Sequence, residues 1–309
     1  MAFVSTSLAS PTGARLNLYA SLAPNPRGVV QVNHGLAEHA ARYERFAGAM
    51  AARGFHVYAH DHRGHGHTKA PGASLGRFAE ADGADKVIAD VLAVHDHIAA
   101  QHPGLPVIVF GHSFGGLVAL NFVMSHPGRA AGLAVWNANF SAGALGRVAQ
   151  GILRWEAFRL GSDVPSRLLP KLTFQAWAKA IPNKRTEFDW LSRDPAEVDK
   201  YVADPLCGWD ASVSMWRDVF SLIFRGADDR NLAALPRDLP INLLGGAKDP
   251  ATDGGKAVEH LAGRMRRLGF SNLLSRVWPD TRHESLNELN RDVITEEFAV
   301  WAEGVVGRT

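Results

Sequence analysis

The chain has 309 residues, of which 46% are apolar and 21% charged, the balance of an ordinary globular protein. Its formal net charge is +2 and its lysines and arginines are scattered, whereas a nucleic-acid-binding protein gathers them on one face, so we expect no nucleic-acid partner. Cys207 is the only cysteine, which excludes an intrachain disulfide, and neither a secretory signal nor a membrane-spanning run is recognisable, so we expect a cytoplasmic protein.

Short apolar runs alternate with longer amphipathic stretches in the first 137 residues. Apolar side chains at every second position, or an unbroken β-branched run, indicate strands, whereas a spacing of three and four residues indicates helices. These patterns predict strands at residues 15–20, 28–35, 55–60, 106–110 and 132–137, and helices at 42–54, 85–104 and 115–127. Such an alternation is typical of βαβ units, which form a parallel sheet with helices on both faces.

The alternation stops after Asn137. From there to about Gly226 the sequence has helical patches but no clear buried strand. The alternation then resumes with a strand at 239–246, a helix at 254–269, a strand at 272–278 and a closing helix at 284–304. We therefore expect an α/β core made of residues 1–137 and 227–309, interrupted by a helical insertion at 138–226.

The segment after the strand at 106–110 carries the most specific chemical signal. Gly111-His112-Ser113-Phe114-Gly115 fits the pattern G-x-S-x-G, and it lies between a buried strand and an apolar helix. In this context the pattern predicts a sharp turn that lifts the serine hydroxyl above the edge of the sheet and points the helix N-terminus at the reaction centre. We expect Ser113 to be a nucleophile; an idle serine in a tight turn is the alternative.

A serine hydroxyl needs a base, and the base needs a carboxylate that orients it. In proteins with this turn, the acid and then the histidine follow the serine along the chain, each after a core strand. Asp249 and His283 each follow one of the last two predicted strands, so we expect them to be the acid and the base. Three rivals fit less well, because Asp253 is typical of a helix N-cap, Asp280 follows the wrong strand and His260 lies within a helix.

Four histidines, His60, His62, His65 and His67, lie within eight residues. A zinc site is one interpretation, but the ligand pattern His-x-His-x-Asp-His fails because Gly64 stands where the aspartate is needed. We therefore favour a structural loop, in which His62 and His67 are little constrained. Further histidines on or near the helix at 85–104 are expected to face solvent: His95, His97 and His102.

Taken together, these segments resemble the α/β-hydrolase superfamily, and within it the monoacylglycerol lipase and lysophospholipase group. The segments that carry the resemblance are NHGLAEHAARY (33–43), DHRGHGHT (61–68), GHSFGG (111–116), GGAKDPATDGGK (245–256) and RHESLNELNRD (282–292). The resemblance implies an α/β-hydrolase fold: a mostly parallel eight-stranded sheet flanked by helices, with residues 138–226 as a helical lid over the site.

By the same resemblance, residues 34–39 form an oxyanion loop, and the backbone N–H groups of Leu36 and Phe114 would hold the oxyanion of the reaction. Two interpretations are open for the side chains of Glu38 and His39. They contact the polar head of a substrate, or, as we favour, they cap the next helix and support the loop. The loop at 61–66 is expected to be fixed by an Asp–Arg or Asp–backbone contact, with glycines that allow positive φ.

The resemblance also implies a serine carboxylic-ester hydrolase that works through an acyl-enzyme and needs no cofactor or metal. Its expected substrate is a small acyl ester, a monoacylglycerol or a lysophospholipid, and peripheral contact with a lipid surface is compatible with it; the oligomeric state is left open. A short-chain carboxylesterase of broad specificity and a ligand-binding protein without activity are the alternatives. The insertion's tryptophans form either an apolar acyl-binding wall or a small core of its own: Trp155, Trp177, Trp190, Trp209 and Trp216.

Overall fold

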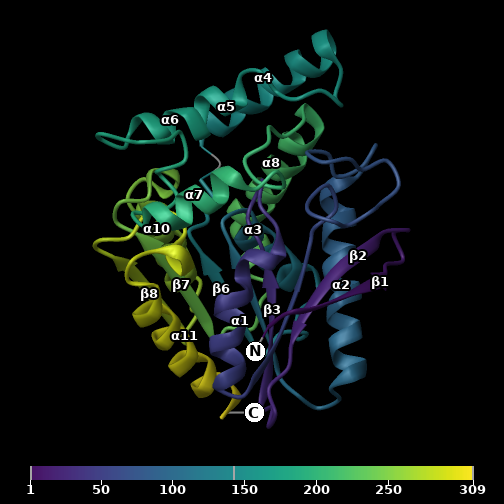
Figure 1. The fold of residues 1–309 in the computed structure, drawn as a ribbon, viewed down its shortest axis with the longest axis vertical. Coiled ribbons are helices and arrows are strands. Elements are labelled where there is room, and N and C mark those ends of the chain that lie inside the picture. The colour runs from purple at the N-terminus through teal and green to yellow at the C-terminus, as the bar shows by residue number, and fades with distance from the viewer. Residues whose placement is uncertain (1, 142, 308–309) are drawn as a thin grey trace.

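Eight strands form one sheet in a computed structural model that describes residues 2–141 and 143–307 (Figure 1). The strands lie in the order β1-β2-β4-β3-β5-β6-β7-β8. Neighbours from β4 to β8 run parallel, whereas β1 and β2 form an antiparallel edge, so the mostly parallel sheet expected from the sequence is confirmed. In chain order the strands are β1 Val4–Ala9, β2 Arg15–Ser21, β3 Gly28–Asn33, β4 Phe55–His60, β5 Val107–His112, β6 Gly132–Trp136, β7 Ile241–Gly246 and β8 Leu273–Trp278.

The central strands are largely apolar because helices cover both faces of the sheet. Every residue of β3, β4, β5, β6 and β7 is buried, which produces the apolar runs seen in the sequence. Two helices pack on one face, α1 (Glu44–Ala52) and α11 (Arg291–Val306). The opposite face is covered by α2 (Gly83–Gln101), α3 (Phe114–Ser125), α8 (Val213–Ala227) and α10 (Lys256–Arg267).

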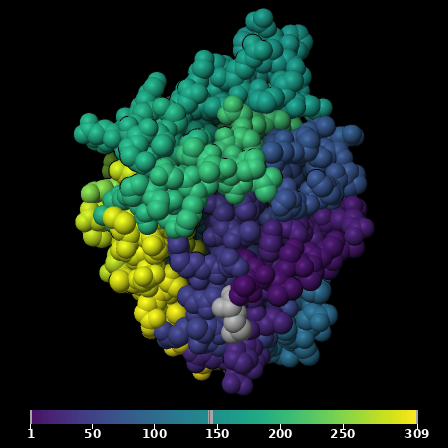
Figure 2. All heavy atoms as spheres, viewed as in Figure 1, coloured from purple at the N-terminus to yellow at the C-terminus, as the bar shows by residue number. Residues whose placement is uncertain are grey.

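The stretch after β6 consists of helices that cover one end of the molecule (Figures 1 and 2). They are α4 Ala144–Leu160, α5 Leu169–Leu172, α6 Phe174–Lys179, α7 Pro195–Ala203 and α8, followed by the short α9 Asp229–Leu232. Helix α8 also packs on α3, since the side-chain amide of Asn121 in α3 donates to the carbonyl of Leu222 in α8 at 3.0 Å. Within the described part of the chain, no helix has the length and hydrophobicity that crossing a bilayer requires.

Two elements differ from those that the sequence predicts. Strand β1 was not predicted, because five of its six residues are exposed at the sheet edge and it has no apolar face. The closing helix begins at Arg291 rather than at Glu284. The intervening segment contains a short 3₁₀ turn, Ser285–Asn287, and the carboxylate of Glu288 accepts hydrogen bonds from the backbone N–H groups of Arg282 and Leu289, which hold it out of the helix.

The histidine-rich loop after β4 is mostly buried. His60 and His62 are 0% and 1% exposed, and the ring of His34 lies against those of His62 and His65, with centroids 4.4 and 5.0 Å apart. The expectation of little constraint is therefore wrong for His62, whose ring is enclosed by other rings. It is compatible with His67, which is exposed.

Asp61 fixes this loop. Its carboxylate accepts hydrogen bonds from the backbone N–H groups of Ala40 and His67, both at 2.9 Å, so the expected Asp–backbone contact is confirmed. Gly66 has φ +48°, and a Cβ there would lie 2.3 Å from the Asp61 carboxylate, which explains the glycine. The expected contact between Asp61 and Arg63 is not made, because the Nε atom of Arg63 donates to the buried carboxylate of Asp90 in α2 at 2.7 Å.

One of the three histidines on or near α2 also differs from expectation. His95 was expected to face solvent, but it is 3% exposed because its side of α2 packs against the sheet. Its Nδ1 atom lies 2.9 Å from the side-chain oxygen of Gln31 in β3. His97 and His102 are partly exposed.

Acid should destabilise this fold through its buried histidines. Burial lowers the pKa of His60 to about 4, and it also lowers the pKa values of His34, His62 and His65. Because these folded-state pKa values lie below the ordinary value of about 6.5, the unfolded chain binds more protons over that interval, and stability is lost as the pH falls below about 6.5. We expect urea titration to give a smaller free energy of unfolding at about pH 5 than at about pH 7.

A single substitution isolates one of these histidines. His60→Leu should reduce the pH dependence of the free energy of unfolding by up to about 1.4 kcal/mol per pH unit between the two pKa values, the contribution of one proton. His67→Gln is the matched control, because His67 belongs to the same loop but is exposed. An unchanged slope in His60→Leu, or an equal reduction in both variants, would contradict the prediction.

Candidate active site

Ser113 lies in a sharp turn between β5 and α3. Its backbone has φ 55° and ψ −119°, a conformation that costs a non-glycine residue on the order of 1–3 kcal/mol. The glycines two positions to either side make the turn sterically feasible. A Cβ at Gly111 would lie 2.0 Å from the carbonyl oxygen of Gly115, and a Cβ at Gly115 would lie 2.0 Å from that of Asn33. The turn leaves the Ser113 side chain at the floor of a cavity.

The two residues that the sequence paired with Ser113 meet it in space. The Nε2 atom of His283 lies 2.8 Å from the Ser113 hydroxyl, and its Nδ1 atom lies 3.0 Å from each carboxylate oxygen of Asp249. Asp249 follows β7 and His283 follows β8, so the parallel strands bring both loops to one edge of the sheet. Because a carboxylate only accepts, Nδ1 carries the ring hydrogen and Nε2 is free to accept the serine proton.

The Asp249 carboxylate is fully buried and firmly held. Besides His283, its donors are the side-chain amide of Asn137 at 3.0 Å, the hydroxyl of Thr252 at 2.8 Å and the backbone N–H of Ala251 at 2.9 Å. Burial raises the pKa of Asp249, but the charge of His283 and these hydrogen bonds outweigh it and hold the pKa below its ordinary value. The carboxylate therefore stays ionised and points in one direction, as an orienting acid must.

The three rivals lie elsewhere. Asp253 is exposed and its carboxylate pairs with Lys256 at 3.0 Å. It is not the N-cap of α10, because Gly255 occupies that position, so this expectation is wrong. Asp280 is exposed on the loop after β8, and His260 is exposed on α10.

Leu36 and Phe114 line the same cavity as Ser113. Phe114 is the first residue of α3, so its N–H has no partner within the helix, and the helix dipole adds partial positive charge at this end. Leu36 lies in the oxyanion loop after β3, the strand next to β5. No described residue accepts a hydrogen bond from either N–H, which leaves both free to bind an anion.

The cavity above Ser113 has a volume of about 810 Å³, within the range of small-molecule sites. Helices α4 to α8 supply most of its apolar wall, which includes Ile152, Leu169, Phe174, Val219, Phe220 and Ile223. Four of the five tryptophans of the insertion line it as well: Trp177, Trp190, Trp209 and Trp216. Trp155 lies apart, on α4, and is 51% exposed. The insertion therefore encloses an apolar space directly over the serine.

The sequence matches the family described as serine aminopeptidase, S33, over residues 24–290. The chain belongs to this family. It is 30% identical to the monoacylglycerol lipase of Mycolicibacterium smegmatis, over 90% of this chain and 88% of that protein, and 28% identical to the monoglyceride lipase of Homo sapiens, over 86% and 82%. Among solved structures, a thermostable carboxyl esterase from Bacillus coagulans superimposes with a TM-score of 0.89 at 24% identity over 99% of both chains. The resemblance to the α/β-hydrolases is thereby confirmed, and the chain is a hydrolase.

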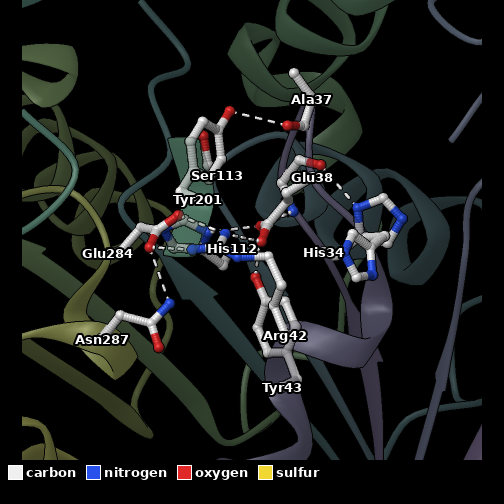
Figure 3. A network of polar contacts seen from close by, with 12 residues as sticks. His34, Ala37, Glu38, Arg42, Tyr43, His112, Ser113, Tyr201, Glu284 and Asn287 are labelled. Carbon is white, nitrogen blue, oxygen red and sulfur yellow. Dashed lines mark hydrogen bonds and ion pairs between the residues drawn. The ribbon is translucent and has the colours of Figure 1, made fainter. Parts of the chain in front are cut away.

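A buried ion network beside Ser113 of this hydrolase escaped the sequence analysis (Figure 3). Arg42 donates to both carboxylate oxygens of Glu284 at 2.6 Å, and to Oε2 of Glu38 at 2.5 Å. All three side chains are at most 11% exposed. Glu284 directly follows His283, so the network ties the histidine loop to the oxyanion loop. The Glu38–Arg42 spacing was a visible signal, but Glu284 lies 242 residues away from Arg42 and no local pattern links them.

His112 borders this network. Its Nε2 atom lies 2.9 Å from the backbone carbonyl of His283, and its Nδ1 atom lies 3.5 Å from Oε1 of Glu38. Burial lowers the pKa of His112, but Glu38 and Glu284 outweigh it and raise the pKa above its ordinary value. Because a carbonyl only accepts, Nε2 carries a hydrogen and anchors the backbone of the histidine loop.

The two polar residues beside the oxyanion loop have different roles. Glu38 supports the loop, since its Oε1 atom accepts from the backbone N–H of Gly35 at 2.6 Å and from the hydroxyl of Tyr43 at 2.9 Å, which confirms the favoured interpretation. His39 precedes the short 3₁₀ helix but makes no capping bond with its side chain, so the expectation is wrong there. Its Nε2 atom instead lies 2.7 Å from the carboxylate of Asp204, after α7.

Among the described residues, one group of potential metal ligands is compact: His39, Asp204 and Cys207, with ligand atoms within 4.8 Å of one another. The bond between His39 and Asp204 already engages two of them. Burial raises the pKa of the Cys207 thiol, which disfavours the thiolate that a metal needs. We interpret this group as a contact between the oxyanion loop and the insertion.

Replacing Arg42 should expose the strength of the buried network. Arg42→Met leaves Glu38 and Glu284 without their cation, so we expect the free energy of unfolding to fall by about 3–5 kcal/mol, as for other broken buried pairs. Arg45→Met is the matched control. Arg45 pairs with Glu197 at 2.9 Å but its side chain is 42% exposed, so its loss should cost less than about 1 kcal/mol. Urea unfolding measures both values, and equal losses would contradict the prediction.

Proposed function

We propose that this hydrolase cleaves carboxylic esters through an acyl-enzyme on Ser113, with His283 as general base and Asp249 as the orienting carboxylate. The observation that carries the proposal is the unbroken hydrogen-bonded chain from the Ser113 hydroxyl through His283 to Asp249, at the floor of an apolar cavity. Nucleophile, base and orienting acid in this arrangement are the equipment of acyl-transfer enzymes.

In the first half-reaction, His283 Nε2 takes the hydroxyl proton as Ser113 Oγ attacks the ester carbonyl carbon. The carbonyl oxygen becomes an oxyanion, which the N–H groups of Leu36 and Phe114 hold. The bond between the carbonyl carbon and the alcohol oxygen then breaks, and the alcohol leaves with the proton from His283. Asp249 remains ionised throughout and stabilises the imidazolium that forms between these steps.

In the second half-reaction, water attacks the acyl-enzyme. His283 takes a proton from the water as its oxygen bonds to the acyl carbon, and the same two N–H groups hold the second oxyanion. The bond to Ser113 Oγ then breaks, and the serine recovers its proton from His283. The products are a carboxylic acid, an alcohol and the free enzyme.

Monoacylglycerols are the proposed substrates. The relatives described above as monoacylglycerol lipase and monoglyceride lipase support this substrate class. The apolar cavity suits an acyl chain. Its charged lining residues are Glu38 and Glu284, and no lysine or arginine of the described chain lines it, so the polar end suits a neutral glycerol better than the phosphate of a lysophospholipid.

Residues 138–226 are proposed to act as a lid that also meets the lipid surface. Helix α4 exposes Val148, Trp155 and Phe158, the last at 90%. Arginines accompany them, and the guanidinium of Arg159 lies 5.3 Å from the ring of Trp155. Apolar and basic side chains together on one exposed helix are typical of contact with an anionic membrane surface.

Substitution of the proposed triad tests the mechanism. We expect Ser113→Ala to abolish ester hydrolysis, and Asp249→Asn to lower kcat by roughly 10⁴ with little change in KM, because the carboxylate acts on the transition state. Asp253→Asn, in the same loop but exposed, is the matched control and should retain wild-type kcat. The assay compares p-nitrophenyl esters from acetate to palmitate with monoacylglycerol and lysophosphatidylcholine.

The outcomes of this assay distinguish the proposed function from its alternatives. Preference for monoacylglycerol supports the proposal, and a preference confined to acetate and butyrate indicates a short-chain carboxylesterase. Hydrolysis that survives in Ser113→Ala refutes the mechanism. A folded wild type that cleaves no ester indicates a ligand-binding protein.

Vesicle binding tests the exposed face of α4. We expect the double variant Trp155→Ser/Phe158→Ser to bind vesicles of phosphatidylcholine and phosphatidylglycerol about tenfold less well than the wild type, because two large apolar side chains no longer enter the interface. Val300→Ser is the control, since Val300 is 55% exposed on α11, away from the insertion. Co-sedimentation measures the bound fraction, and equal binding of all three proteins would exclude this contact.

A further inference from the structure

The peptide group between Gly35 and Leu36 carries one of the two proposed oxyanion donors. This peptide group is trans. The N–H and C=O of a trans peptide group point in opposite directions, so whatever holds the Gly35 carbonyl also decides where the Leu36 N–H points.

The side chain of His34 holds that carbonyl. Its Nδ1 atom lies 2.7 Å from the carbonyl oxygen of Gly35, and its Nε2 atom lies 3.0 Å from the backbone nitrogen of His62. A carbonyl oxygen only accepts and a backbone N–H only donates, so the two neighbours require a single tautomer, with the hydrogen on Nδ1 and none on Nε2. His34 therefore donates to the peptide group whose other side is the Leu36 N–H.

His34 is not among the residues that line the cavity. Gly35 and Leu36 line the cavity, whereas His34 is 0% exposed and packs against the rings of His62 and His65. The Gly35 carbonyl is thus turned away from the substrate space. The N–H on the opposite side of the same peptide group is turned toward it.

Further bonds fix the loop on both sides of this peptide group. Before it, the N–H of Gly35 donates to Glu38 at 2.6 Å, and a Cβ at Gly35 would lie 2.7 Å from that carboxylate. After it, the carbonyl of Ala37 accepts from the N–H of Gly208 at 2.9 Å. Two peptide groups, Gly35–Leu36 and Leu36–Ala37, lie between these anchors, and His34 holds the first of them.

We propose that His34 is a positioning residue for ester hydrolysis: its Nδ1–H fixes the Gly35 carbonyl and thereby aims the Leu36 N–H at the oxyanion. This proposal rests on the acyl-enzyme mechanism proposed above. The ring stays neutral, because burial lowers the pKa of His34 more than the nearby carboxylates Glu38 and Asp61 raise it. A protonated ring would lose the acceptor that the His62 N–H requires.

Asparagine and glutamine separate the two bonds of His34. The amide nitrogen of His34→Asn can occupy the place of Nδ1, the amide oxygen of His34→Gln reaches the place of Nε2, and His34→Ala removes both groups. His60→Gln is the matched control, because His60 is equally buried and its ring nitrogens have no hydrogen-bond partner in the described chain.

Four quantities are measured for each variant. They are kcat and KM on p-nitrophenyl butyrate, the inhibition constant of a trifluoromethyl ketone, and the fraction of protein that a serine-reactive phosphonate labels. The ketone is informative because its adduct with Ser113 carries an oxyanion, whereas the ground-state ester does not. Rates are expressed per labelled site, so that a loss of folded protein does not count as a loss of catalysis.

We expect His34→Ala and His34→Gln to lower kcat per labelled site by about tenfold to a hundredfold, up to the loss known for removal of an oxyanion donor, with KM changed by less than about twofold. The inhibition constant of the ketone should rise by the same factor as kcat falls. His34→Asn should recover most of kcat, and His60→Gln should match the wild type. Unchanged kcat and inhibition constant in His34→Gln, or an asparagine variant as impaired as the alanine variant, would overturn the proposal.

Failure of the underlying mechanism has a different signature. The acyl-enzyme mechanism is wrong if the wild type hydrolyses no ester, if the phosphonate does not label the wild type, or if the Ser113→Ala variant remains active. In each of these cases the proposed role of His34 is wrong as well. If the wild type is labelled and Ser113→Ala is inactive while the His34 variants behave like the wild type, only the role of His34 is wrong.

Discussion

The close approach of helix α3 to the end of strand β3 is the constraint on which the site depends. Gly115 lies so near the carbonyl of Asn33 that no side chain fits between them. This contact places the start of α3 beside the oxyanion loop, and the strained Ser113 directly precedes that helix. The strain is sustained because the sheet holds the turn, with the Ser113 N–H donating to the carbonyl of Trp136 at 2.8 Å.

A polar network and an apolar wall meet at the loops of the site. Behind the loops, Arg42 pairs with two glutamates and His112 faces the same pair, so each buried charge has a partner of opposite sign. In front of them, the cavity presents mainly aliphatic and aromatic side chains. The loops are therefore held by strong, directional bonds, and Glu38 and Glu284 also border the largely apolar space proposed for the acyl chain.

Local sequence patterns predicted the central strands and also the serine, aspartate and histidine of the site, because each of these three residues closely follows the end of a strand. Prediction failed where distant segments decide. Strand β1 is an exposed edge without an apolar face, and the burial of His62 and His95 depends on rings and amides from other parts of the chain. The partnership of Arg42 with Glu284 spans 242 residues, so no sequence window contains it.

The long separation between Arg42 and Glu284 also means that the parts of the site are synthesised at different times. The ribosome synthesises the oxyanion loop and Ser113 long before it adds His283 and Glu284. Until then Arg42 lacks the carboxylate to which it makes two hydrogen bonds, and Ser113 lacks His283. The growing chain can fold much of its sheet in the meantime, as N-terminal segments of large proteins do. His283 and Glu284 are added only with the last segment of the chain, just before helix α11, which packs on one face of the sheet. A chain that has not yet reached residue 283 therefore contains Ser113 without the histidine that its hydroxyl contacts in the folded protein.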